Sequence, residues 1–144
     1  MVDESLLKDI KKAQEAGASA ASPDDVVKAF TFIKAISVEN EDLKEELEDM
    51  DIAIQLVIND ADKKYWLTVK DGDLDFGEGD VENPSFTMSS TLEVGAGILM
   101  GEVDATSAYM AGDITVEGNL QDAMAFQEII ELALEAYEDL IEDL

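Results

Sequence analysis

Apolar residues recur every three or four positions in the first third of the chain, a spacing typical of amphipathic helices. Ser22 is expected to cap one of these helices, because Ser is a favoured N-cap and the following Pro23 suits a first helical turn. The small residues before it, over 17–21, are interpreted as a linker. The helices predicted in this part cover residues 3–16, a segment from Ser22 past Ile33, and residues 40–50.

From residue 52 the apolar period changes to two, which indicates half-buried strands. Asp71 and Gly72 are a strong signal for a tight hairpin turn between two of these strands. The five predicted strands cover residues 52–58, 65–70, 74–76, 86–89 and 113–117. Because the strands are largely consecutive, the predicted fold is α+β, with a mixed or antiparallel five-stranded sheet and about five helices covering one face.

Glycines and capping residues divide the C-terminal third into short elements. Ser90 and Glu93 have the spacing of a capping box, so a helix is expected to begin near Thr91 and to end at Gly101. A second short helix is predicted over residues 105–111, and the last helix is the longest.

The last helix carries two adjoining apolar stripes, which together are wider than packing on one sheet requires. On the pattern alone, a buried terminal helix or a dimer seam explains this width; a lid over a cavity is the functional alternative. The two stripes consist of Ala123, Phe126, Ile130, Ala133, Leu134, Tyr137 and Ile141, and of Ala125, Ile129, Leu132, Ala136 and Leu140.

The chain is strongly acidic, with 35 Asp and Glu residues against nine lysines and a formal net charge of −26. This balance argues against nucleic-acid binding, whose affinity comes largely from neutralising phosphates. It also argues against stable attachment to an anionic membrane. Two interpretations of the acidity stay open, a high-salt cytoplasm and a basic partner.

Cys, His and Arg are all absent. Their absence excludes disulfides, a thiol nucleophile, a histidine base and a guanidinium clamp, so any catalysis could use only carboxylates, Ser, Thr, Tyr or Lys. No cofactor is expected. A ligand would therefore be recognised by its apolar body rather than by a charged head. No stretch approaches the roughly 20 apolar residues of a membrane span and no signal-peptide pattern is present, so a cytoplasmic protein is expected.

The acidic run from Asp71 to Glu82 imitates the spacing of a calcium-binding loop. Phe76, however, occupies the position where such a loop needs Gly. The run is interpreted as a hairpin with an acidic outer face, and no metal site is expected.

Several motifs of the C-terminal third resemble the sterol carrier protein 2 family of small lipid-binding domains. They are GEVD (101–104), SAYMAG (107–112), DITVEGNL (113–120) and AMAFQ (123–127), with YWLTVKDG (65–72) upstream. The resemblance covers residues 22–144, which are expected to form the lipid-binding domain, and leaves 1–21 as an N-terminal helical extension and linker.

The resemblance implies non-enzymatic binding of a lipid in an apolar cavity between the sheet and the helices, capped by the C-terminal helix. Methionine suits such a cavity because it adapts to irregular apolar shapes. The residues expected to line it are Met88, Leu99, Met100, Tyr109, Met110, Ile114, Met124 and Ile129, with Phe30 and Ile33 as additions.

The expected partner is a hydrophobic small molecule such as a sterol, fatty acyl or isoprenoid lipid. The alternative is an interaction, regulatory or dimerisation module, in which the chain's own side chains fill the cavity and a homodimer forms. Domains of one fold host different functions, so the resemblance leaves both open.

Overall fold

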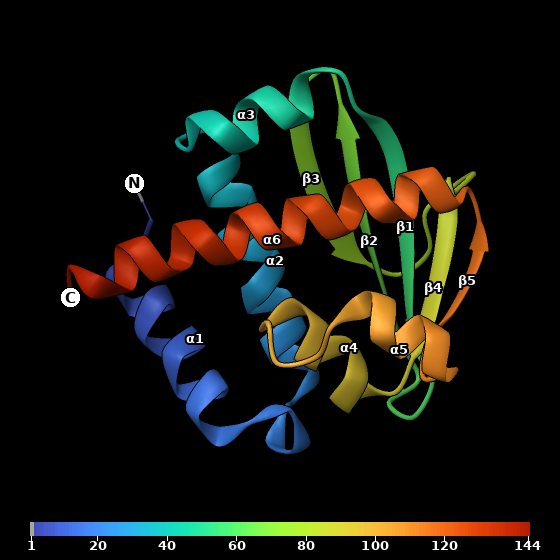
Figure 1. The fold of residues 1–144 in the computed structure, drawn as a ribbon, viewed down its shortest axis with the longest axis horizontal. Helices are drawn as coiled ribbons and strands as arrows, with labels where there is room; N and C mark the ends of the chain where they lie inside the picture. Colours follow the sequence, from blue (N-terminus) through green and yellow to red (C-terminus); the bar gives the residue numbers. More distant parts are fainter. Residues whose placement is uncertain (1) are drawn as a thin grey trace.

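Residues 2–144, which the computed structural model describes, form a five-stranded mixed sheet whose inner face packs against helices (Figure 1). The helices are α1 (Glu4–Ala16), α2 (Pro23–Ser37), α3 (Glu41–Glu48), α4 (Leu92–Leu99), α5 (Ala105–Ala111) and α6 (Leu120–Glu142), with a 3₁₀ turn η1 (Ala18–Ala20). The strands are β1 (Asp51–Ile58), β2 (Lys63–Lys70), β3 (Asp73–Glu78), β4 (Phe86–Ser90) and β5 (Thr115–Gly118). The predicted α+β fold is thereby confirmed.

The sheet has the order β3-β2-β1-β4-β5. β1 and β4 are parallel, with Leu56 opposite Met88, and the other neighbouring strands are antiparallel. The predicted hairpin turn lies between β2 and β3, where Asp71 and Gly72 both have positive φ, at 52° and 84°. Two central residues with positive φ match the right-handed twist of the flanking strands.

The core lies between the inner face of the sheet and the helices. Alternation in β1 and β2 turns Ile54 and Leu67 inward, where both are at most 1% exposed. The outer face of these strands carries half-buried residues such as Trp66 and Thr68. The long helix α6 has 23 residues, so it is about 35 Å long and crosses the whole helical layer (Figure 1).

One local prediction near a helix end differs from the structure. The N-cap of α4 is Thr91, whose hydroxyl accepts a hydrogen bond from the Val94 amide, while Ser90 is the last residue of β4. The capping residue lies one position later because the pairing of β4 with β1 extends through Ser90. The small residues over 17–21 include η1, in which Ala18 is 2% exposed and donates its N–H to Glu102 Oε2.

No helix within residues 2–144 combines the length and apolarity that crossing a membrane would require.

Candidate functional site

An apolar cavity of about 280 Å³, here called the main cavity, lies between β4 and β5 on one side and α4, α5 and the first half of α6 on the other. Its volume is just below the roughly 300–1,000 Å³ of typical small-molecule sites. The lining consists of Phe86, Met88, Ile98, Ala105, Thr106, Tyr109, Ile114, Val116, Leu120, Ala123, Met124, Phe126, Gln127 and Ile130.

Strand and helix periodicity bring these side chains together. Phe86 and Met88 are two residues apart on β4 and therefore share its inner face. On α6, Ala123, Phe126 and Ile130 recur at three and four residues and therefore face the same side. The main cavity is thus bounded by one strand face and one helix stripe.

No charged side chain belongs to the described lining of the main cavity, although 31% of the residues in the chain are charged. Its polar side chains are those of Thr106, Gln127 and Tyr109, and the first two are paired with each other. The Thr106 hydroxyl donates to Gln127 Oε1 at 3.2 Å, and Gln127 Nε2 donates to Glu131 Oε1 at 3.3 Å. The lining is therefore suited to an apolar body and offers no charge to a ligand head.

The main cavity has an exposed apolar rim on α5 and the start of α6. Tyr109, Leu120 and Met124 line the cavity and are 46%, 52% and 68% exposed. Met110, the neighbour of Tyr109, is 81% exposed. An exposed apolar cluster of this kind marks a binding groove or an interaction surface.

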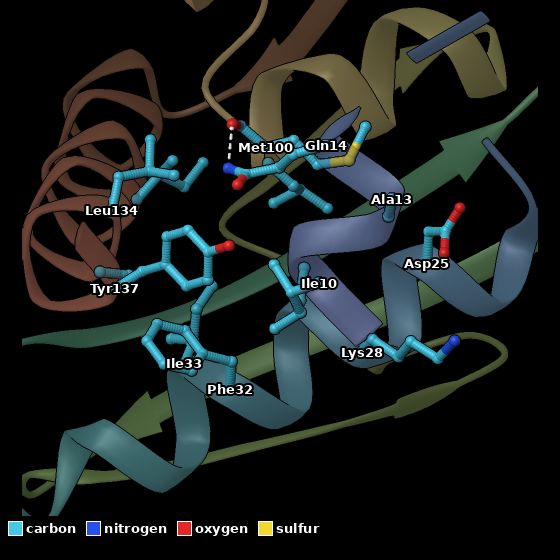
Figure 2. A pocket seen from close by; sticks show the side chains of 14 residues that line it. Ile10, Ala13, Gln14, Asp25, Lys28, Phe32, Ile33, Met100, Leu134 and Tyr137 are labelled. Atoms are coloured by element: carbon cyan, nitrogen blue, oxygen red, sulfur yellow. Dashed lines mark hydrogen bonds between the residues drawn. The ribbon is translucent and has the colours of Figure 1, made fainter. Parts of the chain in front are cut away.

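A second pocket, here called the Tyr137 pocket, lies between α1, α2, α4 and the second half of α6 (Figure 2). Its volume is about 30 Å³. It is lined by Ile10, Ala13, Gln14, Asp25, Lys28, Ala29, Phe32, Ile33, Leu99, Met100, Ile130, Ala133, Leu134 and Tyr137. Ile130 belongs to both linings, so the two spaces adjoin at this residue.

The structure brings four of the eight expected lining residues together in the main cavity: Met88, Tyr109, Ile114 and Met124. Leu99 and Met100 line the Tyr137 pocket instead, because the C-terminal end of α4 faces α1 and α2. Ile33, one of the two additions, lines the same pocket.

The remaining expected residues lie outside both spaces. Met110 follows Tyr109 on α5, and one step along a helix turns a side chain by about 100°, so it points into solvent. Ile129 is fully buried in the core, as is Phe30 at 1% exposed. Phe30 packs edge-to-face against Phe76 with ring centroids 5.8 Å apart.

Sequence reasoning missed two phenylalanines of the lining. Phe86 and Phe126 face each other across the core, with centroids 6.1 Å apart, and both line the main cavity. The signal was present, because Phe86 shares the face of Met88 and Phe126 belongs to the first stripe of the last helix. The prediction favoured methionines and did not include these phenylalanines.

The tyrosines with shifted pKa values, Tyr65 and Tyr137, are buried. Burial raises the pKa of Tyr137, and the charge of Glu15 raises it further. Burial also raises the pKa of Tyr65, with smaller contributions from Glu78 and Asp24. The Tyr65 hydroxyl donates to the Pro23 carbonyl at 3.3 Å.

Two carboxyl groups have lowered pKa values because they accept hydrogen bonds. Lys34 lowers the pKa of Asp75 by a side-chain hydrogen bond of 3.0 Å, and the Phe76 amide adds to this effect. The hydroxyl and amide of Ser107 lower the pKa of Asp104, the N-cap of α5. Both groups lie outside the two spaces, and no group of three carboxylates within residues 2–144 is placed to hold a metal ion.

The model of the SCP-2 sterol transfer family matches residues 32–131. The chain belongs to this family. The matched range contains every residue that lines the main cavity, so the family expected from the sequence motifs is confirmed over the whole of this site.

Solved structures show the same fold in several proteins. The sterol carrier protein domain 2 of Helicoverpa armigera is 20% identical, with a TM-score of 0.62 over 80% of this chain and 94% of that one. Palmitated SCP2L2 of Aedes aegypti is 18% identical, with a TM-score of 0.58 over 76% of this chain and 95% of that one.

A part of a larger enzyme is also similar. The inverting sec-alkylsulfatase Pisa1 of Pseudomonas sp. is 19% identical, with a TM-score of 0.54 over 62% of this chain. The similar region covers only 14% of the sulfatase, so the chain spans a small part of that enzyme. Among curated proteins, no sequence matches significantly.

Proposed function

We propose that this protein binds a lipid or another hydrophobic molecule reversibly in the main cavity, with α6 as the cap, and that it catalyses no reaction. The observation that carries the proposal is the uncharged lining of a cavity in a chain with a net charge of −26. Membership of a sterol transfer family supports the same function. A cytoplasmic carrier of this kind would take up its ligand mainly by apolar burial.

The energy available from burial is sufficient for a carrier. Removing a methylene group from water contributes about 0.8 kcal/mol, so about ten methylenes supply about 8 kcal/mol before ordering and association costs. Micromolar affinity corresponds to about 8 kcal/mol. A ligand held at this strength or somewhat more weakly is also released readily, as transfer requires.

Native mass spectrometry of gently purified protein, with organic extraction of the bound molecule, tests the proposal. We expect a stoichiometric lipid mass on the wild-type chain. Ala123→Trp should abolish that mass, because the indole fills the main cavity. Ala16→Trp is the matched control, since Ala16 is exposed at the end of α1 and lines neither space. Equal lipid content in the two variants would contradict the proposed site.

A second candidate function is an interaction module, in which the apolar rim of α5 and α6 docks a protein. The exposure of Tyr109, Met110, Leu120 and Met124 favours it. Sedimentation velocity over a range of concentrations distinguishes the two functions. A lipid-free dimer that dissociates when Met110 and Met124 are both changed to Ser would support the module, and a lipid-bound monomer would support the carrier.

A further inference from the structure

The Tyr137 hydroxyl is buried and has no hydrogen-bond partner within residues 2–144. The residue is 5% exposed, and its ring packs edge-to-face on Phe32 with centroids 5.8 Å apart. Figure 2 shows the hydroxyl pointing from α6 into the pocket, toward the side where α1 carries Ile10 and Gln14. A buried hydroxyl without a partner is unfavourable, so this group is available to an occupant of the pocket.

The other polar side chains of the pocket are already engaged. Gln14 Nε2 donates to the Met100 carbonyl at 3.0 Å. Asp25 accepts the Ser22 amide at 2.9 Å, and Lys28 pairs with Asp24 at 3.4 Å. Tyr137 is the residue of this largely apolar lining whose buried polar atom has no partner within residues 2–144. A few polar groups in a largely apolar lining are typical of a site that orients a ligand.

The pocket continues the main cavity along one face of α6. Phe126 and Ile130 line the main cavity, and Ile130, Ala133 and Tyr137 line the pocket. Phe126 and Tyr137 are eleven residues apart on the helix, which corresponds to about 16 Å. Ile130 lines both spaces, so its side chain lies where the two adjoin.

The pocket is built mainly by segments outside the range that matches the family. Nine of its fourteen lining residues lie before residue 32 or after residue 131. They are Ile10, Ala13, Gln14, Asp25, Lys28, Ala29, Ala133, Leu134 and Tyr137. The pocket is therefore a property of this chain's own N-terminal helices and of the second half of α6.

We propose that the Tyr137 pocket binds the polar end of an uncharged lipid, whose hydroxyl or carbonyl oxygen accepts a hydrogen bond from the Tyr137 hydroxyl while its apolar chain passes Ile130 into the main cavity. This inference rests on the proposed function and names the ligand class for it.

The charges around the pocket select against an ionised head. Asp25 lines it, and Glu15 is close enough to raise the pKa of Tyr137. Lys28, the cation of the lining, is paired with Asp24. A carboxylate head would meet net negative charge in this environment, whereas the oxygen of an uncharged alcohol or ketone head accepts the hydrogen bond that Tyr137 donates.

Displacement of the neutral dye Nile red from the full chain, by 1-dodecanol and by dodecane, tests the proposal. Tyr137→Phe removes the hydroxyl and keeps the ring. We expect it to weaken 1-dodecanol binding roughly three- to tenfold, the range for a lost hydrogen bond, and to leave dodecane binding unchanged. The comparison of two probes in two proteins isolates the hydroxyl–ligand interaction from general packing effects.

Tyr65→Phe is the matched control, because it removes a hydroxyl from a buried tyrosine that lines neither space. It should leave the ratio of the two affinities unchanged. An equal effect of Tyr137→Phe on both probes, or no effect on either, would overturn the proposal. The pocket would then hold a water molecule and no polar end of a lipid. Loss of the 1-dodecanol preference in Tyr109→Phe instead would overturn it by placing the polar end at the rim.

Failure of the proposed function gives a different result. In that case neither probe displaces the dye from the wild-type chain, and both proposals are overturned together. If dodecane binds and Tyr137→Phe leaves the affinity ratio at its wild-type value, the main cavity stands as the lipid site and only the assignment of the polar end fails.

Discussion

The side-chain amide of Gln14 donates a hydrogen bond of 3.0 Å to the carbonyl of Met100, 86 residues further along the chain. Met100 is the C-cap residue of α4, so this bond joins α1 to the end of α4 (Figure 2). A few residues later Ala18 N–H donates to Glu102 Oε2 at 3.0 Å. These two bonds hold α1 over the Tyr137 pocket.

Gln14→Ala should loosen α1 without unfolding the domain. The lost bond contributes about 1 kcal/mol, and α1 buries mainly Leu7. We expect faster amide hydrogen exchange over residues 4–16 and unchanged exchange in β1. Gln121→Ala is the control, because Gln121 is exposed and its side chain forms none of the observed hydrogen bonds. Unchanged exchange in α1 would mean that apolar packing alone holds the helix.

The two buried tyrosines should respond in opposite ways to loss of their hydroxyls. Tyr65 donates to the Pro23 carbonyl, so Tyr65→Phe should lower the free energy of unfolding by about 1 kcal/mol. Tyr137 has no partner among the described residues, so Tyr137→Phe should leave that free energy unchanged or raise it by up to about 1 kcal/mol. Urea denaturation of ligand-free protein measures both. A clear loss of stability in Tyr137→Phe would reveal a bound partner of its hydroxyl.

Aspartate substitutions at Met110 and Ile129 should affect stability very differently, because one residue lies on the surface and the other in the core. Met110→Asp places a charge in solvent, since this residue is 81% exposed, and should change the unfolding free energy by less than about 0.5 kcal/mol. Ile129→Asp buries an unpaired charge at a position with 0% exposure and should prevent folding. Circular dichroism and thermal denaturation measure the difference. Unfolding of Met110→Asp would show that the rim is covered in solution.

Gly97 in α4 lies too close to its neighbours for a larger residue. A Cβ atom at this position would lie 2.6 Å from Val103 Cγ2 and 3.3 Å from Ala18 Cβ. Gly97→Ala should therefore lower stability by about 1 kcal/mol, because overpacking exceeds the gain in helix propensity. In a Val103→Ala background the same change should raise stability, which urea denaturation of the four proteins measures. Additive effects of the two substitutions would contradict the close contact.

The ion pair between Lys34 and Asp75 should contribute fully to stability only above the pKa of Asp75 in the unfolded chain. The pKa of Asp75 is lowered in the folded state, so the contribution is complete above the ordinary value of 3.8 and is lost as the pH falls through the folded value. Asp75→Asn should therefore destabilise the protein slightly at pH 7 and have a smaller effect near pH 2. Asp73→Asn on the same strand is the control. A destabilisation that is the same at both pH values would exclude the ion pair as its cause.

Local sequence signals predicted most secondary-structure elements. Asp71 and Gly72 specify a turn with two positive φ angles. Asp104 caps α5 by accepting a hydrogen bond from the amide of Ser107, three residues later. Period-two alternation identified β1 and β2 because every second side chain of each strand points to the same buried face. The cap of α4 was misplaced by one residue because long-range pairing of β4 with β1 competes with the local capping signal.

The residues by themselves determined that the protein is an acidic α+β domain with an apolar, uncharged interior and with neither thiol nor imidazole chemistry. Only the tertiary structure decided how α6 divides its apolar stripe between two spaces, with Phe126 in the main cavity and Tyr137 in the pocket. The physical reason is that periodicity specifies which side chains share a face of a helix. Which elements pack against that face depends on contacts between residues that are distant in the sequence. The bond from Gln14 to Met100 is such a contact, and it places α1 over Tyr137.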